Sequence, residues 1–144
     1  MSAGYSGTPL VKKLGIKEGF RVALVGAPRG FRDELLDLPG GVSFVTSVQG
    51  QLDLVLFFAT TRSELTRNFS QLAAKLKPAG MLWIAWPKKA SGVATDLSDG
   101  VVRETGLDAG LVDVKVCAVN DIWSGLKFVI RVKDRTNRLT ERSP

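Results

Sequence analysis

Residues 52–87 constrain the fold more than any other stretch of the sequence. They contain two nearly continuous apolar runs, Leu52–Phe58 and Met81–Trp86, on either side of an amphipathic segment. Short apolar runs bounded by Gly and Pro are typical of strands buried on both faces of a parallel sheet, and a fully buried helix is the alternative for each run. Strand, helix and strand in succession predict a parallel, right-handed β–α–β unit.

The segment between the two runs carries the start and stop signals of a helix. Thr61 and Glu64 have the T-x-x-E spacing of a capping box. Pro78 and Gly80 end the helical pattern. Four apolar residues recur at helical spacing and predict the face that packs on a sheet: Leu65, Phe69, Leu72 and Leu76.

Helix and strand signals alternate through the rest of the chain. Before residue 52, the sequence predicts a short helix over 9–14 that ends at Gly15, a strand over Arg21–Val25, a short helix over Arg32–Leu38 and a strand over Val42–Thr46. After residue 87, it predicts a helix over Leu97–Thr105 that Gly100 interrupts. Strands over Leu111–Val119 and Leu126–Val132 then form a hairpin around 120–125.

This order predicts a single α/β domain over residues 1–132, followed by a disordered tail over 133–144. The expected architecture is a three-layer, Rossmann-like fold with a sheet of about six strands. The sheet is mostly parallel and ends in an antiparallel C-terminal hairpin. The interval 47–51 is too short to hold a further helix and strand.

The composition predicts a soluble globular chain. Hydrophobic residues make up 44% of the sequence and charged residues 24%, which is ordinary for such a chain. No run approaches the roughly 18 apolar residues of a membrane helix, and the start MSAGYSGTP lacks the apolar core of a signal peptide. Cys117 is the only cysteine, so no intrachain disulfide can form. We therefore expect a cytoplasmic protein without membrane association, in which Cys117 is a core side chain.

The residue types that usually carry hydrolytic or metal chemistry are scarce. There is no histidine, which removes the usual acid–base group near neutral pH and the commonest transition-metal ligand. Neither Ser63 nor Ser124 has the G-x-S-x-G setting of an activated nucleophile. The sequence therefore predicts no metal site and identifies no catalytic residue.

The net charge of +6 does not by itself indicate nucleic-acid binding. Residues 133–144 contain four basic and two acidic side chains and so contribute +2, which leaves +4 for the remainder. No RNA-binding signature and no Arg-rich helix accompanies this charge. A solvated basic surface is the favoured interpretation.

Glycines and polar residues follow the predicted strands at their carboxyl ends. In an open α/β sheet these ends meet at one edge, where ligands bind. Arg29, Arg62, Lys88 and Lys89 would face one crevice there, and helices that begin after Gly30 and at Thr61 would add positive dipole ends. We therefore expect a small anionic ligand. The candidate binding residues are Gly26, Pro28, Arg29, Gly30, Lys88, Lys89, Asp121 and Trp123.

A purely structural role for the same residues is the alternative. In that case Pro28 and Gly30 shape a tight turn, the lysines are solvated, and Trp123 packs over the sheet edge. Asp53 begins a buried strand, and we interpret it as a cap or loop anchor rather than a catalyst.

The succession of elements resembles the class I S-adenosylmethionine methyltransferase fold. Residues 21–30 take the place of that family's first strand and glycine loop, Leu52–Phe58 its fourth strand and Met81–Trp86 its fifth. The closing pair over 111–132 resembles its antiparallel end. The segments GYSGTPLVKKLGIK and NDIWSGLKFVIR are also similar to an uncharacterised bacterial domain family of unknown function, which implies no activity.

Several departures from the methyltransferase pattern bear on function. The segment GAPRG has two glycines four positions apart, where that family has closely spaced ones. Thr46 and Ser47 stand where that family has an acid for the ribose hydroxyls, and Val25 with Gly26 replaces the acid after its first strand. The third strand and its helix are missing.

These departures favour a non-catalytic, methyltransferase-like binding or regulatory module over an enzyme. The alternative is a small S-adenosylmethionine-dependent methyltransferase in which Ala27, Pro28 and Arg29 line the cofactor, while Asp121 and Trp123 frame the substrate. A second protomer or another protein is the expected partner, because loss of the third strand leaves apolar surface. Nucleic acid is not favoured.

Overall fold

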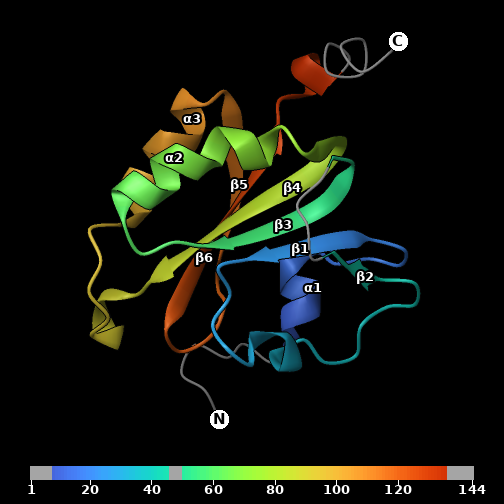
Figure 1. Ribbon diagram of the computed structural model, residues 1–144, viewed down its shortest axis with the longest axis horizontal. Coiled ribbons are helices and arrows are strands. Elements are labelled where there is room, and N and C mark those ends of the chain that lie inside the picture. The colour runs from blue at the N-terminus through green and yellow to red at the C-terminus, as the bar shows by residue number, and fades with distance from the viewer. Residues whose placement is uncertain (1–7, 46–49, 136–144) are drawn as a thin grey trace.

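Six strands form one twisted sheet with helices on both faces (Figure 1). The computed structural model describes residues 8–45 and 50–135. The strands are β1 (Arg21–Val25), β2 (Ser43–Phe44), β3 (Leu52–Phe58), β4 (Leu76–Pro87), β5 (Leu111–Ala118) and β6 (Trp123–Ile130). The helices are α1 (Leu10–Leu14), α2 (Arg62–Ala73) and α3 (Asp99–Asp108), with short 3₁₀ turns η1 (Phe31–Glu34) and η2 (Lys89–Ser91).

The strand order is β2-β1-β3-β4-β6-β5, and β1 to β4 run parallel. Strand β6 is antiparallel to both of its neighbours, β4 and β5. The predicted α/β class, the strand number and the antiparallel C-terminal pair are therefore confirmed. The order reverses direction between β1 and β3, which makes their carboxyl ends the topological switch point of the sheet.

Two apolar clusters separate the faces of the sheet because successive strand residues point to opposite sides. Helices α2 and α3 pack on one face, where Phe69 and Val102 join Val55 and Phe57. Helix α1 and η1 pack on the other, where Leu14 and Phe31 join the alternate residues of β3. Both clusters share β3 and β4, which explains why these strands are apolar along almost their entire length.

Helix α2 begins as predicted. The Oγ1 of Thr61 accepts from the Glu64 N–H at 3.1 Å, as in a capping box, and Glu64 Oε1 accepts from the N–H of Thr60, the residue before the cap, at 3.0 Å. The helix ends at Ala73, and Leu76 already belongs to β4. No helix in the described parts of the chain is long and apolar enough to cross a membrane.

Strand β4 begins five residues earlier than the predicted start at Met81. Leu52 pairs with Leu76 while Leu54 pairs with Met81, so residues 77–80 form an irregularity that β3 does not match. Pro78 is tolerated there because a bulge releases it from the hydrogen-bond ladder. A Cβ on Gly80 would lie 2.8 Å from the Leu52 carbonyl oxygen, so this close approach requires glycine.

Four other predicted elements differ in extent. The helix expected over Arg32–Leu38 is only the η1 turn, because Phe31 and Leu35 are buried whereas Leu36 and Leu38 are exposed. The strand expected over Val42–Thr46 is reduced to β2, and Thr46 lies outside the described residues. Helix α3 begins after the Ser98 cap and runs to Asp108 rather than ending at Thr105. Strand β6 is Trp123–Ile130 rather than Leu126–Val132, so it begins inside the connection predicted over 120–125 and ends before the predicted Val132.

Candidate ligand site at the carboxyl edge of the sheet

Gly26 is the first residue after β1 and lies at the switch point. Its φ is +69°, and a Cβ there would lie 2.9 Å from the carbonyl oxygen of Phe58, the last residue of β3. Both features require glycine. The first residue of the GAPRG loop therefore packs directly against the end of the neighbouring strand β3. Ligands of open α/β sheets bind at this edge.

The GAPRG loop closes as a tight turn that leads into η1. Phe31 donates its N–H to the Pro28 carbonyl at 3.0 Å, and Asp33 donates to the Gly30 carbonyl at 3.1 Å. Gly30 has a φ of +82°, and Arg29 and Gly30 are both exposed. The helix expected after Gly30 is thus a single 3₁₀ turn that carries Asp33 and Glu34, so the expected positive helix end is wrong at this position.

Aromatic side chains pack beneath the edge. Phe58 makes edge-on contacts with Phe31 at 4.8 Å and with Trp123 at 5.1 Å between ring centroids. These three rings come from the ends of β3, η1 and β6, so they hold the loop segments together. Trp123 is half-buried in this cluster, which leaves part of its ring exposed at the edge.

Hydrogen bonds connect the hairpin between β5 and β6 to the segment after β4 and to η1. Lys88 donates its backbone N–H to the Ile122 carbonyl at 2.8 Å, and Asn120 donates its side-chain N–H to Glu34 Oε1 at 3.1 Å. Asn120 Oδ1 also accepts from the N–H groups of Ile122 and Trp123, which shapes the turn. The sequence places Asn120 in the predicted hairpin turn, but it gives no signal for Glu34 or for the hydrogen bond between the two.

The start of α2 is occupied by the chain's own carboxylate. Asp96 Oδ1 accepts from the Arg62 N–H at 2.6 Å, and Thr95 donates its hydroxyl to the Thr60 carbonyl at 2.6 Å. The expected role of the Thr61 helix end as a site for an external anion is therefore wrong. Asp96 already supplies the negative charge that the helix dipole favours.

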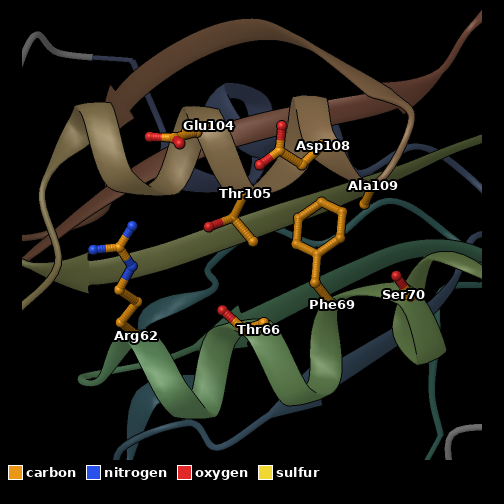
Figure 2. Close-up of a pocket in the computed structure, with 8 residues that line it drawn as sticks. All are labelled: Arg62, Thr66, Phe69, Ser70, Glu104, Thr105, Asp108 and Ala109. Carbon is orange, nitrogen blue, oxygen red and sulfur yellow. The ribbon is translucent and has the colours of Figure 1, made fainter.

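Arg62 does not face the edge. Its side chain lines a groove of about 280 Å³ between α2 and α3, where Thr66 and Ser70 lie opposite Glu104 and Asp108 over the ring of Phe69 (Figure 2). The expectation that Arg62 shares a crevice with the other cations is wrong. A second pocket, of about 400 Å³, lies between α1 and residues 36–39. None of the eight predicted binding residues lines either pocket.

The remaining predicted cations lie on segments that meet at the edge. Lys88 is half-buried directly after β4, Lys89 is exposed at the start of η2, and Asp121 is exposed in the hairpin turn. Among the described residues, no carboxylate forms an ion pair with Arg29, Lys88 or Lys89. Convergence of these three cations on one anion remains a prediction.

Asp53 lies at the opposite edge of the sheet, at the amino end of β3. It accepts from the Arg21 N–H at 2.8 Å and forms an ion pair with Lys77 at 3.2 Å. Its interpretation as a loop anchor is confirmed. No cluster of three or more His, Cys, Asp or Glu residues suited to a metal ion occurs in the described ranges 8–45 and 50–135.

Solved structures with a similar fold include several S-adenosylmethionine methyltransferases. A methyltransferase from Aquifex aeolicus superposes with a TM-score of 0.60 at 18% identity, over 87% of this chain and 89% of that one. The magnesium protoporphyrin IX methyltransferase from Synechocystis gives 0.54 at 14% identity, over 84% and 74% of the two chains. An O-methyltransferase from neocarzinostatin biosynthesis gives 0.61 at 12% identity, over 89% and 51%.

These similarities establish a Rossmann-like, methyltransferase-like fold. No protein-family model matches the sequence, and no curated protein sequence matches it. The resemblance to a bacterial domain family of unknown function therefore stays a prediction.

Proposed function

We propose that this chain binds S-adenosylmethionine at the carboxyl edge of its sheet and acts as a small methyltransferase with an atypical cofactor loop. The observation that carries this proposal is the position of Gly26. It follows β1 at the switch point, with a positive φ that leads directly into an exposed loop. Ligands of open α/β folds bind at this place, and the solved methyltransferases share the fold.

Several groups of the loop and its surroundings suit such a cofactor. Gly26 and Gly30 have no side chain, so a cofactor could approach the backbone closely at the edge. The exposed Arg29 offers a cation for the methionine carboxylate of the cofactor. The half-buried Trp123 and the exposed Asp121 stand across the edge, on the β5–β6 hairpin, where a substrate would approach. The bound cofactor would supply an electrophilic methyl group on its sulfonium. The chain's residues would bind and orient it.

A non-catalytic module of the same fold is the second candidate. It is favoured by the loop itself, since Pro28 has no N–H to offer a ligand and its carbonyl already accepts from Phe31. Asn120 and Glu34 are likewise engaged with each other rather than directed at a ligand. In this alternative the edge holds a small anion or a partner without chemistry.

Calorimetric titration with S-adenosylmethionine and S-adenosylhomocysteine separates the two candidates. We expect saturable binding of both, and Arg29→Ala should weaken it by about tenfold or more, since one charge-assisted contact contributes roughly 1.5–3 kcal/mol. The matched control is Arg67→Ala, which removes another exposed arginine, from the middle of α2. Absence of heat and of any thermal shift at millimolar ligand would exclude the methyltransferase and leave the non-catalytic module.

A further inference from the structure

A helix packs along both β5 and β6 on one face of the sheet, whereas the helical layer on the other face covers these two strands only in part. Helix α3 packs on both strands from the side that also carries α2 (Figure 1). On the opposite face, α1 lies over β4, where Trp83 donates its indole N–H to the Leu14 carbonyl at 2.8 Å, and it reaches the carboxyl end of β5, where Lys13 donates to the Ala118 carbonyl at 3.0 Å. Farther from that end, Lys115 is exposed and Val112, Lys127 and Val129 are half-buried.

Lysines gather on this open face. Lys115 of β5 and Lys127 of β6 lie directly opposite each other, and Lys127 also pairs with Trp83 of β4. The Lys127 ammonium stands 6.0 Å from the centre of the buried Trp83 ring. Lys115 reaches across to donate to the Lys13 carbonyl at 3.0 Å, and Lys13 donates to the Ala118 carbonyl at 3.0 Å.

The lysines are close enough to affect one another. Burial lowers the pKa of Lys127, and the charges of Lys115 and Lys17 lower it further. The ion pairs Lys77–Asp53, Arg103–Asp99 and Arg103–Asp113 involve neither Lys115 nor Lys127. The one acid within β5, Asp113, lies opposite Phe128 on the α3 side, where it pairs with Arg103 at 2.8 Å. Like charges directly opposite on neighbouring strands are destabilising, so the fold tolerates a repulsion here that no described acid relieves.

Apolar side chains lie next to the lysines on the same face. Val112 of β5 pairs with Val129 of β6, which in turn pairs with Met81 of β4, and both valines are half-buried. A strip of cations therefore runs beside a strip of aliphatic surface. An amphipathic helix with apolar residues on one side and carboxylates along its flank would match both strips.

The chain itself contains no suitable occupant. Residues 1–7 and 46–49 have no acidic side chain, and residues 136–144 contain one acid, Glu141, and two arginines, Arg138 and Arg142. A second copy docked about a two-fold axis would bring two lysine strips together. Nucleic acid is disfavoured, because none of the described residues beside Lys115 and Lys127 on β5 and β6 is an arginine and the Trp83 ring beneath Lys127 is fully buried.

We propose that the β5–β6 face, defined by Lys13, Lys17, Lys115, Lys127, Val112 and Val129, docks an acidic amphipathic helix of a partner protein. The helix extends the α1 layer over the part of β5 and β6 that α1 leaves uncovered, and its carboxylates neutralise the opposed Lys115 and Lys127. This surface lies on the α1 side of β5 and β6, and its occupation does not depend on whether a cofactor binds at the carboxyl edge.

The test uses a synthetic peptide of about 18 residues, long enough to form a helix, with Leu along one face and Glu on its flanks. We expect it to shift the backbone amide NMR signals of β5 and β6 in the full-length chain. Lys115→Gln/Lys127→Gln should weaken binding by about tenfold, which corresponds to about 1.4 kcal/mol. Lys75→Gln/Lys133→Gln removes the same charge elsewhere and should change the affinity less than about twofold.

The proposal would be overturned if the peptide did not bind the wild type, or if both double variants weakened peptide binding equally. Equal affinity for a peptide with Gln in place of Glu would also overturn it. So would a single-stranded oligonucleotide that binds more tightly than the peptide and depends on Lys115 and Lys127 in the same way. The last outcome would identify the face as a nucleic-acid surface. Misfolding would not mimic the expected result, since removing opposed like charges should leave the melting temperature unchanged or raised.

Discussion

Gly106 of α3 lies against the ring of Phe128 of β6, so closely that a Cβ on Gly106 would overlap three ring carbons. Phe128 also packs edge-on against Phe69 of α2, with ring centroids 5.2 Å apart. One glycine thus sets the distance between α3 and the sheet, and a single ring contacts both helices of this layer.

Gly106→Ala should destabilise the fold by about 1–3 kcal/mol, because the added methyl group forces the helix or the ring to move. This should occur even though Ala favours helix by about 1 kcal/mol over Gly. Gly100 provides the matched control, since it lies in the same helix with nothing within 4 Å of a Cβ. Gly100→Ala should be neutral or stabilising in urea denaturation, and equal effects of the two changes would contradict the assignment.

This pair of glycines also shows where sequence reasoning reached its limit. The sequence predicts that Gly100 interrupts the helix, but Gly100 lies in the first turn of α3 and the helix continues through it. Gly106 has no local signal, because its role depends on Phe128, which lies far along the chain. The β–α–β unit was predictable since the capping box and apolar periodicity of residues 52–87 are local.

The candidate site was predictable only in its position. Parallel topology places the strand ends together, and the sequence shows which residues follow them. Whether a group is free to bind depends on long-range hydrogen bonds such as those of Asp96 with Arg62 and Asn120 with Glu34. No periodicity or spacing reports such contacts, so the predicted anion site at Thr61 was wrong.

Trp83→Phe should destabilise the chain by about 2–4 kcal/mol. The change removes the indole donor to Leu14, leaves that buried carbonyl unsatisfied, and opens space in a fully buried position. Trp86→Phe is the control, because Trp86 is also buried but has no hydrogen bond to the described residues through its indole. Chemical denaturation should give a smaller loss for Trp86→Phe; a loss equal to that of Trp83→Phe would argue against the hydrogen bond.

Acid should weaken the contact between α3 and β5. The guanidinium of Arg103 lowers the pKa of Asp113 below its ordinary 3.8. A carboxyl whose pKa is lower in the folded state contributes stability above its unfolded pKa, and loses it as the pH falls through the folded pKa. Between about pH 5 and pH 2 the wild type should therefore lose more stability than Asp113→Asn. Parallel pH profiles of the two proteins would refute the pair's contribution.

Anions should stabilise the carboxyl edge if Arg29, Lys88 and Lys89 converge there. Phosphate would gain roughly 1.5–3 kcal/mol from each charge-assisted contact in a partly desolvated site, whereas scattered exposed charges would contribute almost nothing. The melting temperature should accordingly rise more in phosphate than in chloride at equal ionic strength. Arg29→Ala and Lys88→Ala/Lys89→Ala should each reduce this difference.

The same variants should keep their melting temperature in phosphate-free buffer, since Arg29 and Lys89 are exposed and the hydrogen bond of Lys88 to the Ile122 carbonyl is made by its backbone N–H, which Ala retains. Arg67→Ala, on the outer side of α2, should retain the full response to phosphate. If phosphate stabilises the wild type no more than chloride does, the three cations do not converge, and GAPRG is a turn beside two solvated lysines. If Arg67→Ala loses the response equally, the effect is one of net charge and not of a site.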